Sequence, residues 1–243
     1  METIQKDDSF LINIVVNNRS IYYITKRLFD VLVASMLIVV LSPILLLISL
    51  GIFIYSPGPI LFIQERVRAK RQLHKGSTYW KRENFKCYKF RTMKVNSDPS
   101  IHQAYVKALI ENDQTGMDSL QGETTTTRKL IHDPRITRPG ALLRKFSLDE
   151  LPQLWNVIRG DMSLVGPRPA IPYEVELYKS WQLHRLAAKP GITGMQQVMA
   201  RCTADFDRQV QFDVEYIENQ SFWLDLKIIL KTPLVVISTK GAH

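Results

Sequence analysis

The sequence predicts a mostly helical α+β protein with one folded domain and a bent apolar helix near its amino terminus. Three observations support this fold class. The 243 residues suffice for one domain of ordinary size. Residues 28–55 form an apolar run in which Asp30 is the single charge. From residue 130 onward, prolines and glycines divide the chain into short apolar runs, as expected for short elements joined by structured loops.

The composition excludes several protein classes. A hydrophobic content of 45% excludes a disordered chain. Two cysteines, Cys87 and Cys202, are too few for a disulfide scaffold and favour a reducing compartment. The chain has no phosphate-loop, G-x-G-x-x-G, H-E-x-x-H or G-x-S-x-G motif, and its five histidines are scattered. We therefore expect its chemistry to use carboxylates and arginines.

The apolar run at 28–55 is longer than the roughly 20 residues that cross a bilayer core. It begins too late and is too long for a signal peptide. Ser42 and Pro43 lie near its middle, where proline bends a helix and a serine hydroxyl can bond a nearby carbonyl. Residue chemistry leaves two alternatives open. One is a re-entrant hairpin with both ends on one face of the membrane, and the other is a straighter spanning helix.

Basic residues flank the apolar run on both sides. Residues 64–91 contain ten lysines and arginines but only two acids, Glu65 and Glu83, out of a net charge of +9 for the whole chain. Such flanks suit a segment whose two ends both lie in the cytoplasm, next to anionic headgroups. The Ser-Pro-Gly-Pro sequence at 56–59 predicts a turn that ends the membrane segment.

The composition of three further segments predicts their secondary structure. Residues 96–129 are polar and predict either a mobile excursion or a solvent-facing helix with loop ends. Apolar positions at helical spacing predict a helix over 205–220. The apolar segment 221–237, with Trp223 and two lysines, is typical of an interfacial helix, although a buried helix fits it equally well.

The strongest candidate site is the carboxylate pair Asp149 and Glu150, which precedes a helix start favoured by Pro152. A helix start favours negative charge and leaves N–H groups free for an anion. Arginines on both sides are expected to lower a carboxylate pKa and keep it ionised. The alternative is a capping box between Ser147 and Glu150 with no chemical role.

Arginines provide the second signal. In Gly-Pro-Arg-Pro at 166–169, two prolines fix the backbone around Arg168, which presents a guanidinium suited to phosphate; a rigid turn with a solvated arginine is the alternative. Lys89 and Arg91 alternate around Phe90 as in a strand, and either contact phosphate or face lipid headgroups.

Nine motifs in chain order resemble those of the bacterial sugar transferases, the monotopic phosphoglycosyl transferases that begin glycan assembly on a polyprenyl carrier. The resemblance extends from about Lys26 to about Thr232. The motifs are KRLFD at 26–30, SP at 42–43, SPGP at 56–59, QERV at 64–67, YKFRTM at 88–93, DPRIT at 133–137, SLDELPQL at 147–154, GDMSLVGPRP at 160–169 and KPGITG at 189–194.

The resemblance implies a monotopic membrane protein. It divides the chain into an N-terminal segment at 1–25, a re-entrant membrane helix at 26–58 broken at Ser42 and Pro43, and a small catalytic domain at 59–243 with interfacial helices. It also implies location in the bacterial inner membrane, with the catalytic domain on the cytoplasmic face.

The resemblance further implies the reaction. Asp149 would attack the β-phosphate of a UDP-sugar, expel UMP and hold a phosphosugar, which polyprenyl (undecaprenyl) phosphate then accepts. Glu150 would be the partner carboxylate, and Mg²⁺ bound at Asp149 and Glu150 would neutralise the diphosphate. Arg168 is similar to the phosphate-binding arginine of the family. Substrate-binding roles for three further arginines follow by the same resemblance: Arg91, Arg135 and Arg144.

The expected partners are therefore a UDP-sugar, polyprenyl phosphate and membrane lipids, with no nucleic acid and with a homodimer as the working expectation. Residues 68–83 and 96–129 are longer than is usual in the family, and no feature predicts which sugar is transferred. The alternative function is a non-catalytic, basic, membrane-anchored scaffold, which gives no reason for the Asp149–Glu150 pair.

Overall fold

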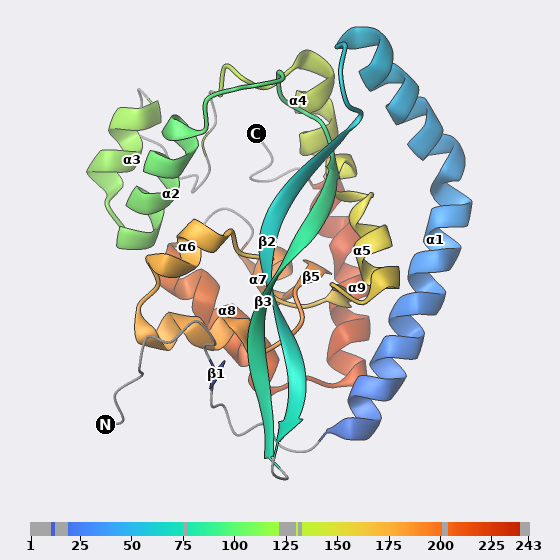
Figure 1. Ribbon diagram of the computed structural model, residues 1–243, viewed down its shortest axis with the longest axis vertical. Coiled ribbons are helices and arrows are strands. Elements are labelled where there is room, and N and C mark those ends of the chain that lie inside the picture. Colours follow the sequence, from blue (N-terminus) through green and yellow to red (C-terminus); the bar gives the residue numbers. More distant parts are fainter. Residues whose placement is uncertain are drawn as a thin grey trace.

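A long antiparallel ribbon forms the centre of the structure, a computed structural model. Strands β2 (Leu61–His74) and β3 (Ser77–Phe90) pair from Leu61 opposite Phe90 onward, and β1 (Leu11–Ile12) adds to β3. The ribbon crosses the middle of the molecule in Figure 1, between α1 on one side and α2 and α3 on the other. The structure describes residues 11–12, 19–74, 77–121, 130, 133–200 and 204–238.

The apolar segment forms helix α1 (Ser20–Tyr55), which begins earlier than the predicted boundary at residue 26. It is the one helix in the described ranges that is long and apolar enough to cross a membrane. The helix continues through Pro43 instead of breaking there, and it curves along the molecule in Figure 1. The Ser42 hydroxyl donates to the Val39 carbonyl at 2.8 Å, as the sequence suggested. The turn at 56–59 ends the helix, with Gly58 at a φ of 124°.

The remaining elements are short, and they confirm a mostly helical α+β fold. The polar segment at 96–129 contains two helices, while its residues 122–129 lie outside the described ranges. The helix predicted over 205–220 is present. The elements after the ribbon are α2 (Ser100–Glu111), α3 (Gln114–Gln121), α4 (Arg138–Lys145), the 3-10 turn η1 (Leu148–Glu150), α5 (Gln153–Arg159), β4 (Ser163–Val165), α6 (Pro172–Glu176), η2 (Ser180–Leu186), β5 (Gly191–Thr193), α7 (Met195–Met199), α8 (Phe206–Glu218) and α9 (Phe222–Ile237).

One hydrophobic core joins elements that are far apart in the sequence. Trp80 and Cys87 of the ribbon, Val157 of α5, Tyr216 of α8 and Ile228 of α9 belong to it, and Ala34 of α1 also packs there. Helix α9 therefore buries one face and leaves the other exposed, including Trp223, Leu230 and Leu234. The prediction of a buried helix therefore holds for one face of α9, and the interfacial alternative stays a prediction for its exposed apolar face.

Both ends of α1 contact the folded domain. Near its start, Lys26 pairs with Asp225 of α9 at 2.8 Å, and Asp30 accepts bonds from the Ser163 hydroxyl and the Leu164 amide. Near its end, Ile52 packs in a second cluster with Phe90 and Leu143. The helix therefore lies along the domain, and its outward side remains apolar and exposed at residues that include Leu32, Val39, Leu46, Leu50 and Phe53.

Candidate active site

The carboxylate pair lies on η1, between α4 and α5. Ser147 precedes it in the left-handed conformation, with a φ of 54°, and its side chain forms no capping bond. The capping-box alternative is therefore wrong. Leu148 and Leu151 on either side of the pair pack against the cluster of Ile52, Phe90 and Leu143. These apolar contacts fix Asp149 and Glu150 beside the end of the ribbon.

Glu150 is held by two cations. Lys89 of β3 donates to Glu150 Oε1 at 2.7 Å, and Arg168 Nη2 lies 3.7 Å from the same oxygen. Burial alone raises the pKa of Glu150, but the attraction of Lys89 and Arg168 outweighs it and lowers the pKa to about 2. Glu150 is therefore a fixed anion.

Asp149 has the opposite environment. Its side chain is buried, yet within the described chain it accepts no hydrogen bond and has no cation at ion-pair distance. Burial, and then repulsion from Glu150, raise its pKa above the ordinary value, although Lys89, Arg144 and Arg168 oppose this. The expectation that surrounding arginines lower this pKa is wrong, because desolvation exceeds their attraction.

The loop that carries Arg168 is locked to a second loop by close backbone contacts. The Gly191 amide donates to the Pro167 carbonyl at 2.8 Å, and the Gly166 amide donates to the Thr193 carbonyl at 2.9 Å. A Cβ on Gly166 would lie 2.2 Å from the Lys189 carbonyl oxygen, so only glycine fits there. This contact explains why the motifs at 160–169 and 189–194 belong to one site.

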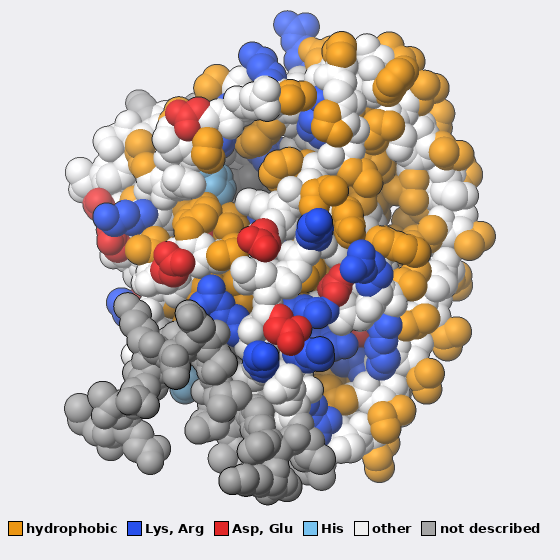
Figure 2. Space-filling model, viewed as in Figure 1, with side chains coloured by type: hydrophobic (Ala, Val, Ile, Leu, Met, Phe, Trp, Pro, Cys, Tyr) orange, Lys and Arg blue, Asp and Glu red, His pale blue; other side chains and the backbone are white. Residues whose placement is uncertain are grey.

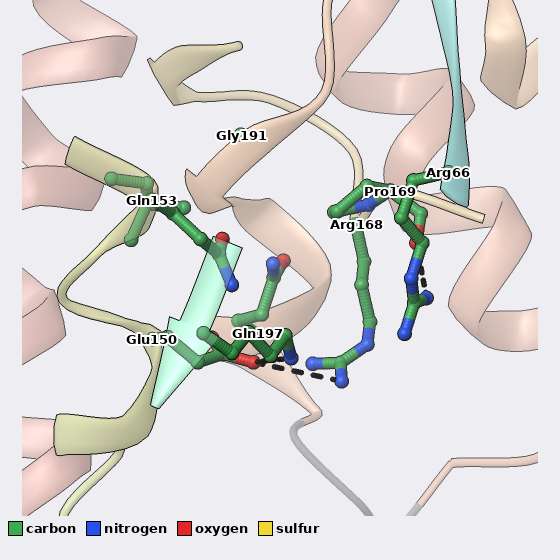
Figure 3. A pocket seen from close by; sticks show the side chains of 9 residues that line it. Arg66, Glu150, Gln153, Arg168, Pro169, Gly191 and Gln197 are labelled. Carbon is green, nitrogen blue, oxygen red and sulfur yellow. Dashed lines mark hydrogen bonds and ion pairs between the residues drawn. The ribbon is translucent and has the colours of Figure 1, made fainter. Parts of the chain in front are cut away.

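A small cavity, open to solvent, lies beside Glu150 (Figure 3). In Figure 3 the Arg168 guanidinium points to Glu150, with Arg66 on the far side of Arg168. Arg66, Gln153 and Gln197 escaped prediction; for Arg66 the available signal was its place in the QERV motif. The lining residues are Arg66, Lys89, Glu150, Gln153, Arg168, Pro169, Gly191, Ile192 and Gln197.

The other predicted arginines lie at different distances from this cavity. Arg144 of α4 donates to the Thr92 hydroxyl at 3.0 Å and is among the charges that act on Asp149. Arg91 is buried and donates to the carbonyls of Ser56 and Pro57, which follow the end of α1. Arg135 pairs with Asp133 at 2.6 Å. The structure therefore brings Arg144 and Arg168 to the carboxylate pair and gives Arg91 and Arg135 other partners.

The described residues contain no group of three or more histidine, cysteine or acidic side chains that could hold a metal ion. Asp149 and Glu150 supply two adjacent carboxylates. Magnesium is often bound by one or two carboxylates together with substrate phosphates and water. The pair therefore fits a magnesium ion shared with a phosphate substrate, and does not fit a metal held by the protein alone.

Comparison with known proteins decides the family. The model of the family described as "Bacterial sugar transferase" matches residues 21–239. This chain belongs to that family. The transferase is 42% identical over 225 residues to the exopolysaccharide production protein ExoY of Sinorhizobium fredii, covering 93% of this chain and 91% of that protein.

Two further relatives are longer than the transferase. It is 39% identical to the undecaprenyl-phosphate galactose phosphotransferase of Salmonella typhimurium, covering 90% of this chain and 41% of that protein. It is 34% identical to the UDP-glucose:undecaprenyl-phosphate glucose-1-phosphate transferase of Escherichia coli, again covering 90% of this chain and 41% of the relative. The named sugars differ between these relatives, so family membership leaves the sugar of the transferase open.

Proposed function

We propose that the protein transfers a sugar phosphate from a UDP-sugar to polyprenyl phosphate, in exopolysaccharide assembly, through a phosphosugar on Asp149. The observation that carries this proposal is the contrast within the carboxylate pair. Glu150 is held by Lys89 and Arg168, whereas no described residue forms a hydrogen bond with Asp149 that would restrain an attacking oxygen. A nucleophile needs such freedom, and a neighbouring anion that is already neutralised limits the repulsion of the incoming phosphate.

Electrostatics also favour a diphosphate substrate. Four cations act on the pair or line the cavity beside it: Lys89, Arg66, Arg144 and Arg168. The two carboxylates of the pair oppose them, with Glu174 acting on Arg66 and Asp133 on Arg144, so the cations around the pair outnumber its carboxylates. A diphosphate ester supplies about two negative charges and matches this surplus.

The proposed reaction has two balanced steps. A carboxylate oxygen of Asp149 attacks the β-phosphorus, and the bond from phosphorus to the bridging oxygen breaks, so that UMP leaves with the electron pair. A phosphate oxygen of the polyprenyl carrier then attacks the same phosphorus. The aspartyl–phosphorus bond breaks, and the carboxylate of Asp149 is regenerated. No proton is consumed, which suits a site whose described lining contains no histidine.

Magnesium is the expected cofactor. Asp149 and Glu150 would hold it together with the substrate phosphates, and it would supply charge neutralisation of the diphosphate and of the departing UMP. Lys89 and Arg168 keep Glu150 ionised, as a magnesium ligand must be.

We further propose that α1 is re-entrant and that the domain lies on the cytoplasmic face of the bacterial inner membrane. The support is that both ends of α1 contact one folded domain, through Lys26 and Asp30 at the start and Ile52 at the end. Figure 2 adds that lysine and arginine side chains gather on this face beside the apolar side chains along α1. Such a border of charge and apolar surface suits a headgroup boundary.

The test is release of UMP from a panel of UDP-sugars by the purified chain, with magnesium and undecaprenyl phosphate in detergent. We expect release with one donor, its loss in Asp149→Asn, and a stoichiometric phosphosugar adduct on the wild type when the acceptor is omitted. Release that survives Asp149→Asn would remove Asp149 as nucleophile. No release from any donor by a folded protein would contradict the transferase activity itself.

A further inference from the structure

Three arginines are buried in the part of the chain that the structure describes, and only two of them have an evident counter-charge. Arg185 pairs with Asp213 at 2.7 Å. Arg91 donates to the carbonyls of Ser56 and Pro57 at the end of α1, where the helix dipole supplies partial negative charge. Among the described residues, no carboxylate lies within ion-pair distance of Arg66, which is 9% exposed.

The hydrogen bonds of Arg66 reach neutral oxygens alone. Nη1 donates to the Pro169 carbonyl at 2.7 Å, and Nε and Nη2 donate to Gln64 Oε1 at 3.1 and 2.7 Å. Gln64 lies two residues earlier on β2, so it faces the same side of the ribbon. Burial lowers the pKa of Arg66, and Glu174 offsets this only in part. A buried guanidinium held in a fixed orientation without a counter-ion is typical of an anion site.

The position of Arg66 indicates which anion it meets. It lines the cavity with Arg168, and in Figure 3 Arg168 lies between Arg66 and Glu150. The order across the cavity is therefore Glu150, then Arg168, then Arg66, and Asp149 precedes Glu150 on η1. In-line transfer requires an order of nucleophile, transferred phosphorus and leaving or entering phosphate. The two orders match if Arg168 meets the transferred phosphate and Arg66 meets the phosphate beyond it.

We propose that Arg66 binds the phosphate that leaves in the first step and the phosphate that enters in the second, so that UMP and the polyprenyl carrier use one phosphate subsite in turn. This inference rests on the proposed function. Each ligand presents a phosphate monoester, and each must lie opposite Asp149 across the transferred phosphorus. Arg66 forms and breaks no covalent bond; it holds the phosphate that carries the leaving or attacking oxygen.

The test compares Arg66→Met and Arg66→Lys with the wild type in three measurements. They are the KM for the UDP-sugar, the half-saturating UMP concentration for exchange of labelled UMP into the UDP-sugar, and the KM for undecaprenyl phosphate. For Arg66→Met we expect all three constants to rise together, by roughly 10- to 100-fold, as for loss of a charge-assisted bond. The maximal rate of UMP release at saturating donor should fall as well, because negative charge builds up on the departing phosphate that Arg66 holds.

Arg66→Lys keeps the positive charge but lacks the planar guanidinium, and it should raise the same three constants by a smaller factor. Arg208→Met is the matched control, because Arg208 lies over Phe212 on α8 and outside the cavity lining. A role confined to supporting the Arg168 loop would instead lower the maximal rate of UMP release and leave the three constants unchanged. That outcome, or a rise in the constant for one phosphate ligand without the other, would overturn the shared subsite. Absence of UMP release by the wild type would overturn the proposed function, and the subsite with it.

Discussion

Asp149 and Glu150 are neighbours in sequence, yet their environments move their pKa values in opposite directions. Lys89 and Arg168 stabilise the charged form of Glu150, while burial without a hydrogen bond penalises the charged form of Asp149. The pair therefore has one carboxylate that stabilises the fold when ionised and one that costs stability when ionised. A reactive group kept at a cost to stability is characteristic of active sites.

This contrast predicts opposite effects of two conservative substitutions. Glu150→Gln should lower the free energy of unfolding at pH 7 by roughly 1–3 kcal/mol, because it leaves the partly buried Lys89 without its ion-pair partner. Asp149→Asn should leave the melting temperature unchanged or raise it, while it abolishes UMP release. Thermal unfolding of both variants in the same detergent checks this, and a strong loss of stability in Asp149→Asn would contradict it.

The direction in which each carboxylate changes stability with pH follows from the difference between its native and unfolded pKa. The pKa of Glu150 is depressed to about 2, so its contribution is present above its unfolded pKa and is lost as the pH falls from about 4.3 towards 2. The pKa of Asp149 is raised, so its native state binds the proton more tightly than the unfolded chain does. Its effect on stability is therefore favourable at low pH and is lost as the pH rises through the native pKa.

A second prediction concerns the rate of the first step. In the proposed reaction the ionised form of Asp149 attacks, so UMP release in the absence of acceptor should decline on acidification at a pH above the ordinary aspartate pKa of about 3.9. Lys89→Met should move this decline to higher pH, because Lys89 is the strongest cation that lowers the Asp149 pKa. Single-turnover rates between pH 4 and 8 measure both, with Lys179→Met as a control at a distant ion pair with Asp207. An unchanged pH profile of UMP release in Lys89→Met would contradict the assignment of this decline to Asp149.

The sequence predicts which residues could form the site better than it predicts their state. The motifs predicted that Glu150 and Arg168 belong to one site. The structure places both residues beside one cavity. The pKa of Asp149 was mispredicted because sequence shows nearby charges but not desolvation. Arg66 was missed because a basic residue within a basic strand gives no sign of burial or of a missing counter-ion.

At the scale of elements, the start of α1 is fastened to the domain by polar groups within an apolar contact. Asp30 accepts bonds from the Ser163 hydroxyl at 2.7 Å and the Leu164 amide at 3.2 Å, at the strand that leads to the Arg168 loop. Arg27 donates to the Val157 and Ile158 carbonyls near the end of α5. Helix α1 and the loop that carries Arg168 are thereby connected through β4.

Loss of this connection should reduce both stability and activity. Asp30→Ala leaves the buried Ser163 and Leu164 donors without an acceptor, which we expect to cost about 2–4 kcal/mol. Thr25→Ala on the exposed side of the same helix is the control, since its hydroxyl bonds only to carbonyls within α1. Thermal unfolding and UMP release measure the effect, and an Asp30→Ala protein as stable as Thr25→Ala would show that this contact does not hold the helix.

Helices could be predicted from the sequence where the spacing of apolar residues or the local composition determines them. The spacing of Phe206, Val210, Val214 and Ile217 gave helix α8, whose buried face includes the first two and the last. The boundary of α1 was mispredicted because it depends on tertiary contacts, in which Tyr22 and Lys26 both bond Asp225 of α9. Pro43 removes one backbone donor, but the surrounding turns carry the helix through it.

At the scale of the whole molecule, the length of α1 and its contacts constrain how the protein meets a membrane. Its 36 residues extend for about 54 Å along the curve, nearly twice the thickness of a bilayer core. A straight spanning helix would carry Ile52 away from Phe90 and Leu143 to the opposite side of the membrane. The contacts at both ends are therefore compatible with entry and exit through one face.

This geometry predicts the accessibility of single cysteines introduced into a background in which Cys87 and Cys202 are replaced. Thr25→Cys, near the start of α1, and Glu65→Cys, just after its end, lie at exposed positions. Both should react with a membrane-impermeant maleimide in inside-out vesicles and be protected in right-side-out vesicles. Leu46→Cys, at an exposed position in the middle of α1, should be protected in both, because only lipid reaches it. Labelling of Thr25→Cys and Glu65→Cys from opposite sides would establish a spanning helix, and the contact between Ile52 and the ribbon would then have to be absent in the membrane.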